Sequence, residues 1–219
     1  DDSSNNRKYF DLSLNPLIHR VKKQKNSFVG FDHLILPVYF YKYKKNISKI
    51  NNIFLFFGGH DHKKLTIKIL NILGKNDLSL NIFVSKLFKN LINKIKINKK
   101  IIYYDQKQYI KKLNFCKIAI TAGGMSLFDN IVMKKKIICI PQYKHQEINA
   151  KKIASKNAIN LLDSNNKNFE KKFNEIFIKL YNDVSSNNII TLKQNKISNM
   201  QKLHKTLILI GKIYAESKN

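Results

Sequence analysis

From about residue 50 onward, short apolar runs alternate with longer segments of helical periodicity. Strands are expected at 53–57, 80–84, 101–104, 117–121, 137–140 and 159–162. Helices are expected near 62–73, 85–95, 107–114, 126–133, 146–156 and 168–182. A strand, a helix and a further strand in this order form a βαβ unit, and repeated units build a parallel sheet with helices on both faces. The sequence therefore predicts an α/β fold with a Rossmann-like, doubly wound parallel sheet.

The two ends of the chain do not follow this alternation. A short strand is expected at 10–14, and an apolar run at 34–41 contains Pro37, which favours an edge strand or an extended segment. The chain begins with Asp rather than Met in a polar stretch, so we expect further residues upstream. We divide the chain into 1–50, the end of a preceding domain plus a linker; 51–185, the Rossmann-like domain; and 186–219, with an amphipathic helix near 192–216 that packs on that domain.

The chain is strongly basic, with 41 Lys and Arg against 14 Asp and Glu and a formal charge of +27. Such a charge is typical of proteins that bind nucleic acid or anionic membranes. However, only Arg7 and Arg20 are arginines, and lysine lacks the planar fork with which arginine binds bases and phosphates. Because Lys, Asn and Ile all have A/T-rich codons, a biased genome explains the charge more simply. A lysine-rich module that binds anionic lipid or RNA is the alternative.

Other compositional features favour a folded cytoplasmic protein. A hydrophobic fraction of 43% predicts a buried core and excludes intrinsic disorder. Cys116 and Cys139 both lie in apolar runs, so neither a disulfide framework nor a metal site is indicated. There is no apolar run of about 18 residues and no signal-peptide pattern. We expect a cytoplasmic location, with peripheral contact at the inner membrane face as an extension.

Two Gly-Gly pairs follow two strands that should be neighbours. In the strand order 3-2-1-4-5-6, the strands at 53–57 and 117–121 lie side by side, and ligands bind at their carboxyl ends. Gly58-Gly59-His60-Asp61 follows the first strand, and Ala122-Gly123-Gly124-Met125-Ser126 follows the second. Each loop leads into a helix N-terminus, where backbone N–H groups and the helix dipole favour an anion. This placement predicts a bound diphosphate.

A purely structural explanation of the glycine loops is the alternative. The glycines would form tight turns, with Asp61 and Ser126 as helix N-caps and Asp129 completing a capping box. The dinucleotide fingerprint G-x-G-x-x-G and the P-loop G-x-x-x-x-G-K-[ST] are both absent from the sequence, which disfavours NAD-dependent dehydrogenases and P-loop ATPases.

Residues 120–159 resemble the nucleotide-sugar-binding segment of the C-terminal domain of family-28-type glycosyltransferases. That segment combines a glycine loop, a helix with an acidic residue, a strand that ends in Pro, and Q-x-x-N-A. These features are found here as Asp129, Pro141, Gln146, Asn149 and Ala150. The family usually has Glu where this chain has Asp129, so the resemblance implies a ribose contact with a reach one methylene shorter.

The front of the chain resembles the UDP-sugar hydrolases of pseudaminic acid biosynthesis and their spore-coat-polysaccharide relatives. The resemblance rests on Asp11-Leu12, Asn15, Gly30, Pro37-x-Tyr39 and, most specifically, Gly58-Gly59-x-Asp61. It implies a GT-B-type protein with two Rossmann-like domains, in which UDP lies mainly on the C-terminal domain. The family's catalytic histidine lies early in the N-terminal domain and has no counterpart in this chain. The chain would then be the donor-binding half.

The resemblances imply a set of residues that bind the UDP-sugar, with Tyr104 and Gln108 near uracil. The set is Gly58, Gly59, His60, Asp61, Tyr104, Gln108, Ala122, Gly123, Gly124, Met125, Ser126, Asp129, Gln146 and Asn149. His60 is otherwise an exposed turn residue. No catalytic residue, cofactor or metal is assigned. The expected partners are a UDP-sugar, the N-terminal domain and an anionic membrane, without specific nucleic acid. UDP-sugar hydrolysis is the favoured reaction, and sugar transfer to an acceptor is the alternative.

Overall fold

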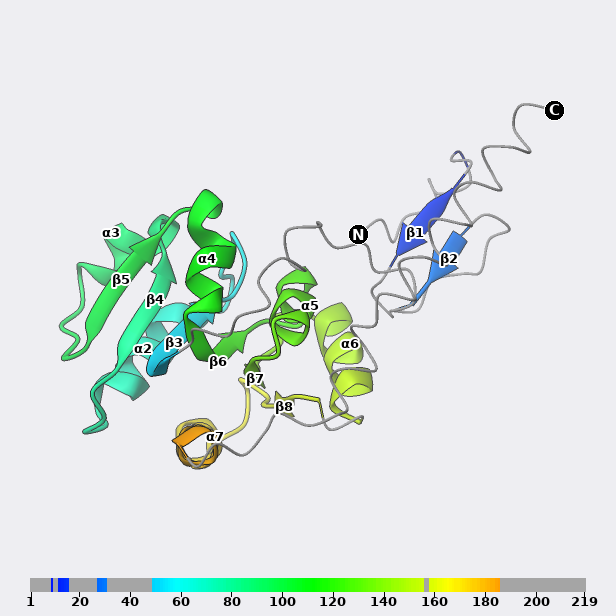
Figure 1. The fold of residues 1–219 in the computed structure, drawn as a ribbon. Helices are drawn as coiled ribbons and strands as arrows, with labels where there is room; N and C mark the ends of the chain where they lie inside the picture. The colour runs from blue at the N-terminus through cyan, green and yellow to red at the C-terminus, as the bar shows by residue number, and fades with distance from the viewer. Residues whose placement is uncertain (1–8, 10–11, 16–26, 31–48, 156–157, 186–219) are drawn as a thin grey trace.

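The computed structural model describes residues 9, 12–15, 27–30, 49–155 and 158–185, and its main feature is a sheet of six parallel strands (Figure 1). The strands are β3 (Lys49–Phe56), β4 (Asn81–Ser85), β5 (Lys100–Tyr104), β6 (Cys116–Thr121), β7 (Lys136–Cys139) and β8 (Asn160–Leu161). They lie in the order β5-β4-β3-β6-β7-β8, and every pairing is parallel. Counted from β3, this is the predicted 3-2-1-4-5-6 order, so the predicted fold class is confirmed.

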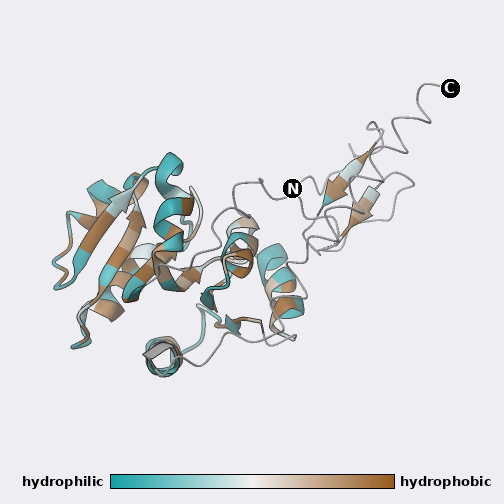
Figure 2. Cartoon of the chain, viewed as in Figure 1, coloured by the Kyte–Doolittle hydropathy of each residue, from teal (hydrophilic) through white to brown (hydrophobic). Residues whose placement is uncertain are grey.

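Helices cover both faces of this sheet (Figure 1). One face carries α2 (Leu65–Gly74), α3 (Lys89–Ile92) and α7 (Phe169–Ser185). The other face carries α4 (Tyr109–Asn114), α5 (Met125–Val132) and α6 (Lys144–Ala154). The strands are largely hydrophobic, whereas the helices have hydrophilic outer surfaces (Figure 2). Burial of a strand on both faces requires apolar residues at successive positions, as expected for a parallel sheet.

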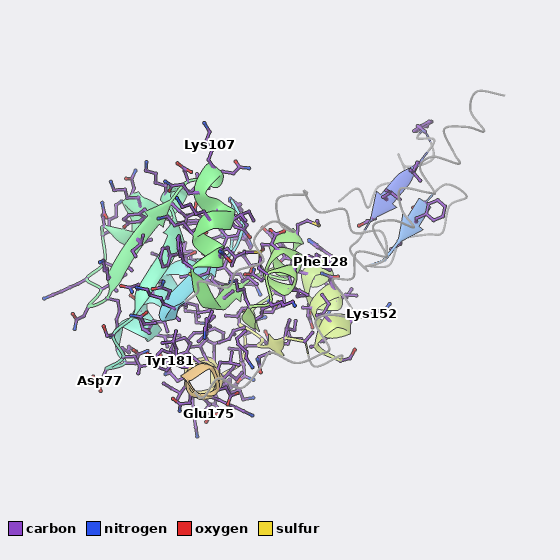
Figure 3. All side chains as sticks on the ribbon, viewed as in Figure 1. Asp77, Lys107, Phe128, Lys152, Glu175 and Tyr181 are labelled. Atoms are coloured by element: carbon purple, nitrogen blue, oxygen red, sulfur yellow. The ribbon has the colours of Figure 1, made fainter. Side chains whose placement is uncertain are left out.

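The expected apolar stripe of the last described helix packs into the core. Phe169, Phe173 and Phe177 are buried on α7, with ring centroids 6.3 Å and 5.9 Å apart along the helix. Charged side chains extend from the opposite surface of α7, as the position of Glu175 shows, and Lys152 extends from the outer surface of α6 (Figure 3). The period of the stripe in the sequence therefore identified the buried face of α7 correctly.

Two helices differ from their expected bounds for local reasons. Lys64 has a left-handed backbone, with φ of 52°, so α2 begins at Leu65 rather than near residue 62. The segment expected as a single helix at 85–95 is instead a 3-10 turn at Lys86–Phe88 followed by the one-turn α3. Beyond α3, i to i+3 hydrogen bonds from Lys94 and Ile95 tighten the chain and end the α-helix.

The N-terminal part contains a small parallel pair, β1 (Ser13–Asn15) with β2 (Ser27–Val29). The strand expected at 10–14 overlaps β1. The extended segment expected at 34–41 and the helix expected near 192–216 lie outside the described residues. No helix within the described ranges combines the length and apolar character needed to cross a bilayer.

One lysine is buried at the sheet edge opposite to the loops that follow the strands. Lys135, just before β7, is 1% exposed, and its Nζ donates a hydrogen bond to the Asn114 carbonyl at 3.3 Å. Burial lowers its pKa to about 8, although the neighbouring Cys116 opposes this shift. The folded protein therefore binds this proton more weakly than the unfolded chain does. The resulting loss of folding stability is fully present below about pH 8 and disappears as the pH rises toward 10.5.

We expect Lys135→Met to raise the free energy of unfolding at pH 7 by about 1–3 kcal/mol, because it removes a buried charge and keeps most of the volume. The gain should shrink between pH 8 and pH 10. Urea unfolding at about pH 7 and about pH 10 measures this change in the free energy of unfolding. Lys111→Met, on the exposed side of α4, is the control. A destabilised Lys135→Met protein at pH 7 would show that the hydrogen bond to Asn114 outweighs the cost of burial.

Candidate functional site

The two glycine loops leave neighbouring strands at the carboxyl edge of the sheet. β3 and β6 pair in register up to Phe56 and Thr121, and the loops follow directly. Here the strand order reverses, since β3 connects through α2 toward β4 while β6 connects through α5 toward β7. This point of an open α/β sheet is where ligands generally bind.

The first loop is closed by its own carboxylate. Gly58 has φ of +93°, a conformation that glycine adopts without strain, and Gly59 is exposed. Asp61 accepts hydrogen bonds from the backbone N–H groups of Leu65 at 2.9 Å and Thr66 at 2.6 Å. Asp61 is not the N-cap residue itself, which is Lys64, but its carboxylate caps the first amides of α2 from three residues earlier. The amides at the start of α2 are occupied and unavailable to an anionic ligand.

The second loop leaves the start of α5 open. Gly124 precedes the helix and provides no side-chain cap. Within the described parts of the chain, no acceptor lies within hydrogen-bonding distance of the Met125 and Ser126 backbone N–H groups. The Ser126 hydroxyl lies inside the helix and shares a hydrogen bond of 2.9 Å with the Thr121 hydroxyl. Gly124 and not Ser126 is the N-cap, so the alternative in which Ser126 and Asp129 form a capping box was wrong. The Met125 and Ser126 N–H groups are donors of the kind that can bind an anion.

The second loop is seated tightly against α6. A Cβ atom on Gly123 would lie 2.5 Å from the Gln146 carbonyl oxygen, so only glycine fits there. The Asn149 amide donates to the Gly123 carbonyl at 2.8 Å, and both Asn149 and Ala122 are buried. Gln146 and Asn149, which the sequence suggested as ligand contacts, thus position the loop itself.

Gln142 joins the loop after β3 to the start of α6 and was missed in the sequence. Its side-chain amide donates to the Phe57 carbonyl at 2.7 Å, and its Oε1 accepts from the Lys63 backbone N–H at 3.1 Å. Its own backbone N–H donates to Gln146 Oε1 at 3.0 Å. Gln142 therefore fixes the loop after β3 relative to the start of α6. Its place directly after Pro141, at a strand end, was the only signal available.

Asp129 lies on α5, half-buried beside Tyr109 of α4. The Tyr109 hydroxyl donates a hydrogen bond to Asp129 Oδ2 at 3.0 Å. Burial raises the pKa of Asp129 to about 6, and the Tyr109 hydrogen bond opposes part of that rise. The carboxylate is therefore ionised at neutral pH and able to accept hydrogen bonds from hydroxyl groups. Tyr109 was not among the residues expected from the sequence.

The two residues expected near a base have structural contacts. Tyr104 is 2% exposed and its ring stacks on Phe54 with centroids 5.0 Å apart, so it belongs to the core. Gln108 is exposed and forms a capping box with Asp105 at the 3-10 turn Gln106–Gln108 that precedes α4. The D-x-x-Q spacing of this capping box was visible in the sequence.

Four aromatic rings stack in a row between the loop after β3 and the loop after β7. His60 and His62 follow β3, and Tyr143 and His145 follow β7. Successive centroids lie 6.3, 5.7 and 5.6 Å apart. Over the residues that the structure describes, no three His, Cys, Asp or Glu side chains lie close enough to bind a metal. His60 is exposed and stacks on the ring of His62.

A cavity of about 270 Å³ lies beyond this row of rings, between α6 and the chain that follows β8. Among its lining residues, Lys144 and Lys151 both form ion pairs with Glu147. Lys63 donates a hydrogen bond from Nζ to the Ser164 hydroxyl at 3.0 Å. None of the loop glycines lines this cavity, so it is separate from the open start of α5.

Solved structures with a similar fold include proteins named as glycosyltransferases. MurG of Acinetobacter baumannii has a TM-score of 0.61 and 15% identity, covering 90% of this chain and 59% of that chain. Spinosyn rhamnosyltransferase SpnG has a TM-score of 0.56 and 16% identity, covering 86% of this chain and 52% of that chain. Glycosyltransferase VinC in complex with DTDP has a TM-score of 0.52 and 13% identity, covering 93% and 51%.

Sequence comparison identifies the family. MJ1062, an uncharacterized protein of Methanocaldococcus jannaschii, is 29% identical over an alignment of 156 residues, and the match covers 64% of this chain and 30% of that protein. The chain thus spans less than two thirds of the length of these relatives. The sequence model described as the glycosyltransferase family 28 C-terminal domain matches residues 30–207. Because this segment covers most of the chain, the protein belongs to the glycosyltransferase family 28 C-terminal domain family.

Proposed function

We propose that residues 51–185 bind the nucleoside diphosphate part of a UDP-sugar. The observation that carries this proposal is the open start of α5, where the Met125 and Ser126 N–H groups follow a glycine loop and have no acceptor among the described residues. In this arrangement the diphosphate accepts hydrogen bonds from these amides, and Asp129 accepts from the ribose hydroxyls. Family membership and the fold shared with VinC, solved in complex with DTDP, support this assignment.

We favour sugar transfer to an acceptor as the reaction of the whole protein. SpnG and VinC are named as a rhamnosyltransferase and a glycosyltransferase, and this chain spans only part of each. A second domain that supplies the acceptor side and the catalytic base would complete the site, with membrane contact where the acceptor is lipid-linked.

Hydrolysis of the UDP-sugar by water is the second candidate. It rests on the Gly58-Gly59-x-Asp61 resemblance, and Asp61 has a helix-capping contact that explains this motif equally well. UDP release that requires an added acceptor supports transfer, whereas release in buffer alone supports hydrolysis.

We expect UDP to raise the melting temperature of the protein more than ADP or CMP does. At a hundredfold excess over Kd, binding to the folded state alone adds about 2.7 kcal/mol, or about 5–10 °C for a domain of this size. Differential scanning fluorimetry with the three nucleotides measures this. Equal shifts with all three would remove the base-specific part of the proposal. Affinity that collapses between about 50 and about 200 mM salt would favour lysine-driven binding to polyanions.

Gly124→Val tests whether the diphosphate approaches the second loop. Gly124 has φ of −87°, and a Cβ there would lie 3.6 Å from Gln146 Nε2, so the substitution fits the fold. The added side chain covers the start of α5, and we expect UDP affinity to fall by at least about tenfold with little change in melting temperature. Titration calorimetry and thermal unfolding measure the two effects.

Gly123→Ala is the matched control for Gly124→Val. Its Cβ would clash with the Gln146 carbonyl, so we expect a loss of about 1–3 kcal/mol in stability. If Gly124→Val is equally destabilised, or binds UDP normally, the second loop has a structural role only.

Asp129→Asn separates ligand binding from stability. We expect UDP affinity to fall roughly tenfold to a hundredfold, because charged hydrogen bonds contribute about 1.5–3 kcal/mol. Stability at pH 7.5 should stay equal or increase, since burial disfavours the ionised carboxylate. A destabilised protein with unchanged UDP affinity would show that Asp129 is structural. The ribose assignment would then be withdrawn.

A further inference from the structure

Tyr109 connects the two helices that border the proposed nucleotide site. It is the first residue of α4, which follows β5, whereas Asp129 lies on α5, which follows the second glycine loop. The 3.0 Å hydrogen bond between the Tyr109 hydroxyl and Asp129 Oδ2 joins the two helices across the point where the strand order reverses. Tyr109 therefore provides a physical link between the loop after β5 and the helix that carries the carboxylate.

The ring of Tyr109 is fixed by other aromatic side chains. It lies edge-on to Phe54 and to Phe56, with centroids 5.3 Å away in both cases. It also lies edge-on to Tyr104 at 6.1 Å. Phe54 and Tyr104 belong to the core, and edge-to-face contacts of this kind favour one ring orientation. These ring contacts therefore hold the Tyr109 hydroxyl beside Asp129.

The contact also constrains the carboxylate. Asp129 enters none of the ion pairs formed by the described residues, so burial and the titratable hydroxyl of Tyr109 determine its charge state. Glu147 of the neighbouring α6 is paired with Lys144 and Lys151. With Oδ2 bound to Tyr109, Oδ1 is the carboxylate oxygen with greater capacity to accept hydrogen bonds from a ligand.

We infer that Tyr109 is a positioning residue for nucleotide binding: it orients Asp129 so that Oδ1 accepts hydrogen bonds from the ribose hydroxyls. The inference rests on the proposed nucleotide site. It also explains how an aspartate can replace the longer glutamate at this position. A hydrogen bond to one carboxylate oxygen orients the short side chain of Asp129.

Tyr109→Phe tests this inference, since it keeps the ring contacts and removes the hydroxyl. At pH 7.5 we expect UDP affinity to fall about three- to tenfold. Affinity of the unaltered protein should decrease below about pH 6 as Asp129 is protonated. Without the hydrogen bond, that decrease should begin at higher pH in Tyr109→Phe. Titrations in the Asp129→Asn protein provide the baseline, because UDP itself also titrates in this range.

A double-mutant cycle separates positioning from direct contact. In the Asp129→Asn background, Tyr109→Phe should cause no further loss of UDP affinity. Tyr103→Phe, which removes a hydroxyl bonded to Asn93 on the opposite face, should leave affinity and pH profile unchanged. This variant controls for the loss of a tyrosine hydroxyl as such.

The outcomes distinguish the inference from the proposed function. If the unaltered protein does not bind UDP, both are overturned. If it binds UDP and Tyr109→Phe has the same affinity and pH profile, only the positioning role is overturned. An equal loss in both backgrounds would show that Tyr109 contacts the nucleotide directly and would also overturn positioning. If Tyr109→Phe has a much lower melting temperature, the unaltered protein provides the test. A pH profile of its UDP affinity that matches that of Asp129→Asn would reject the inference.

Discussion

The contact between Gly123 and the first turn of α6 determines the shape of the site. No side chain fits between Gly123 and the Gln146 carbonyl, and Asn149 fixes the Gly123 carbonyl from the next turn of the same helix. These two contacts hold the loop against α6, with the start of α5 at the carboxyl edge of the sheet. Gln142 extends the arrangement to the first loop through Phe57 and Lys63. Preorganised amides of this kind bind an anion without first paying for loop ordering.

The two glycine loops look alike in sequence and differ in chemistry. Asp61 neutralises the start of α2 with its own carboxylate, whereas α5 has no acidic residue in its first turn and no side-chain cap. The positive end of the α2 dipole already interacts with a carboxylate, whereas the same end of α5 has no acidic partner and favours an added anion. Under the proposed function, this asymmetry favours the second loop for the diphosphate and a mainly conformational role for the first.

The sequence predicted the fold well because burial on two faces leaves a clear pattern. Continuous apolar runs identified all six strands of the large sheet, and the stripe of Phe169, Phe173 and Phe177 identified the buried face of α7. Side-chain partners were harder to predict. Tyr109 and Gln142 act across 20 and 85 residues of chain, so no local spacing reveals them. The alternative capping box at Ser126 is absent because Gly124 is the N-cap of α5, and the Ser126 hydroxyl shares a hydrogen bond with Thr121 of the preceding strand.

The most direct test of this account is an NMR titration of the ¹⁵N-labelled protein with UDP. The account predicts large shifts of the Met125 and Ser126 backbone amide signals, because these N–H groups are the open donors at the start of α5. The Leu65 and Thr66 amides, already bonded to Asp61, should change little. Shifts confined to Leu65 and Thr66, or the absence of any shift at the start of α5 under saturating UDP, would contradict it.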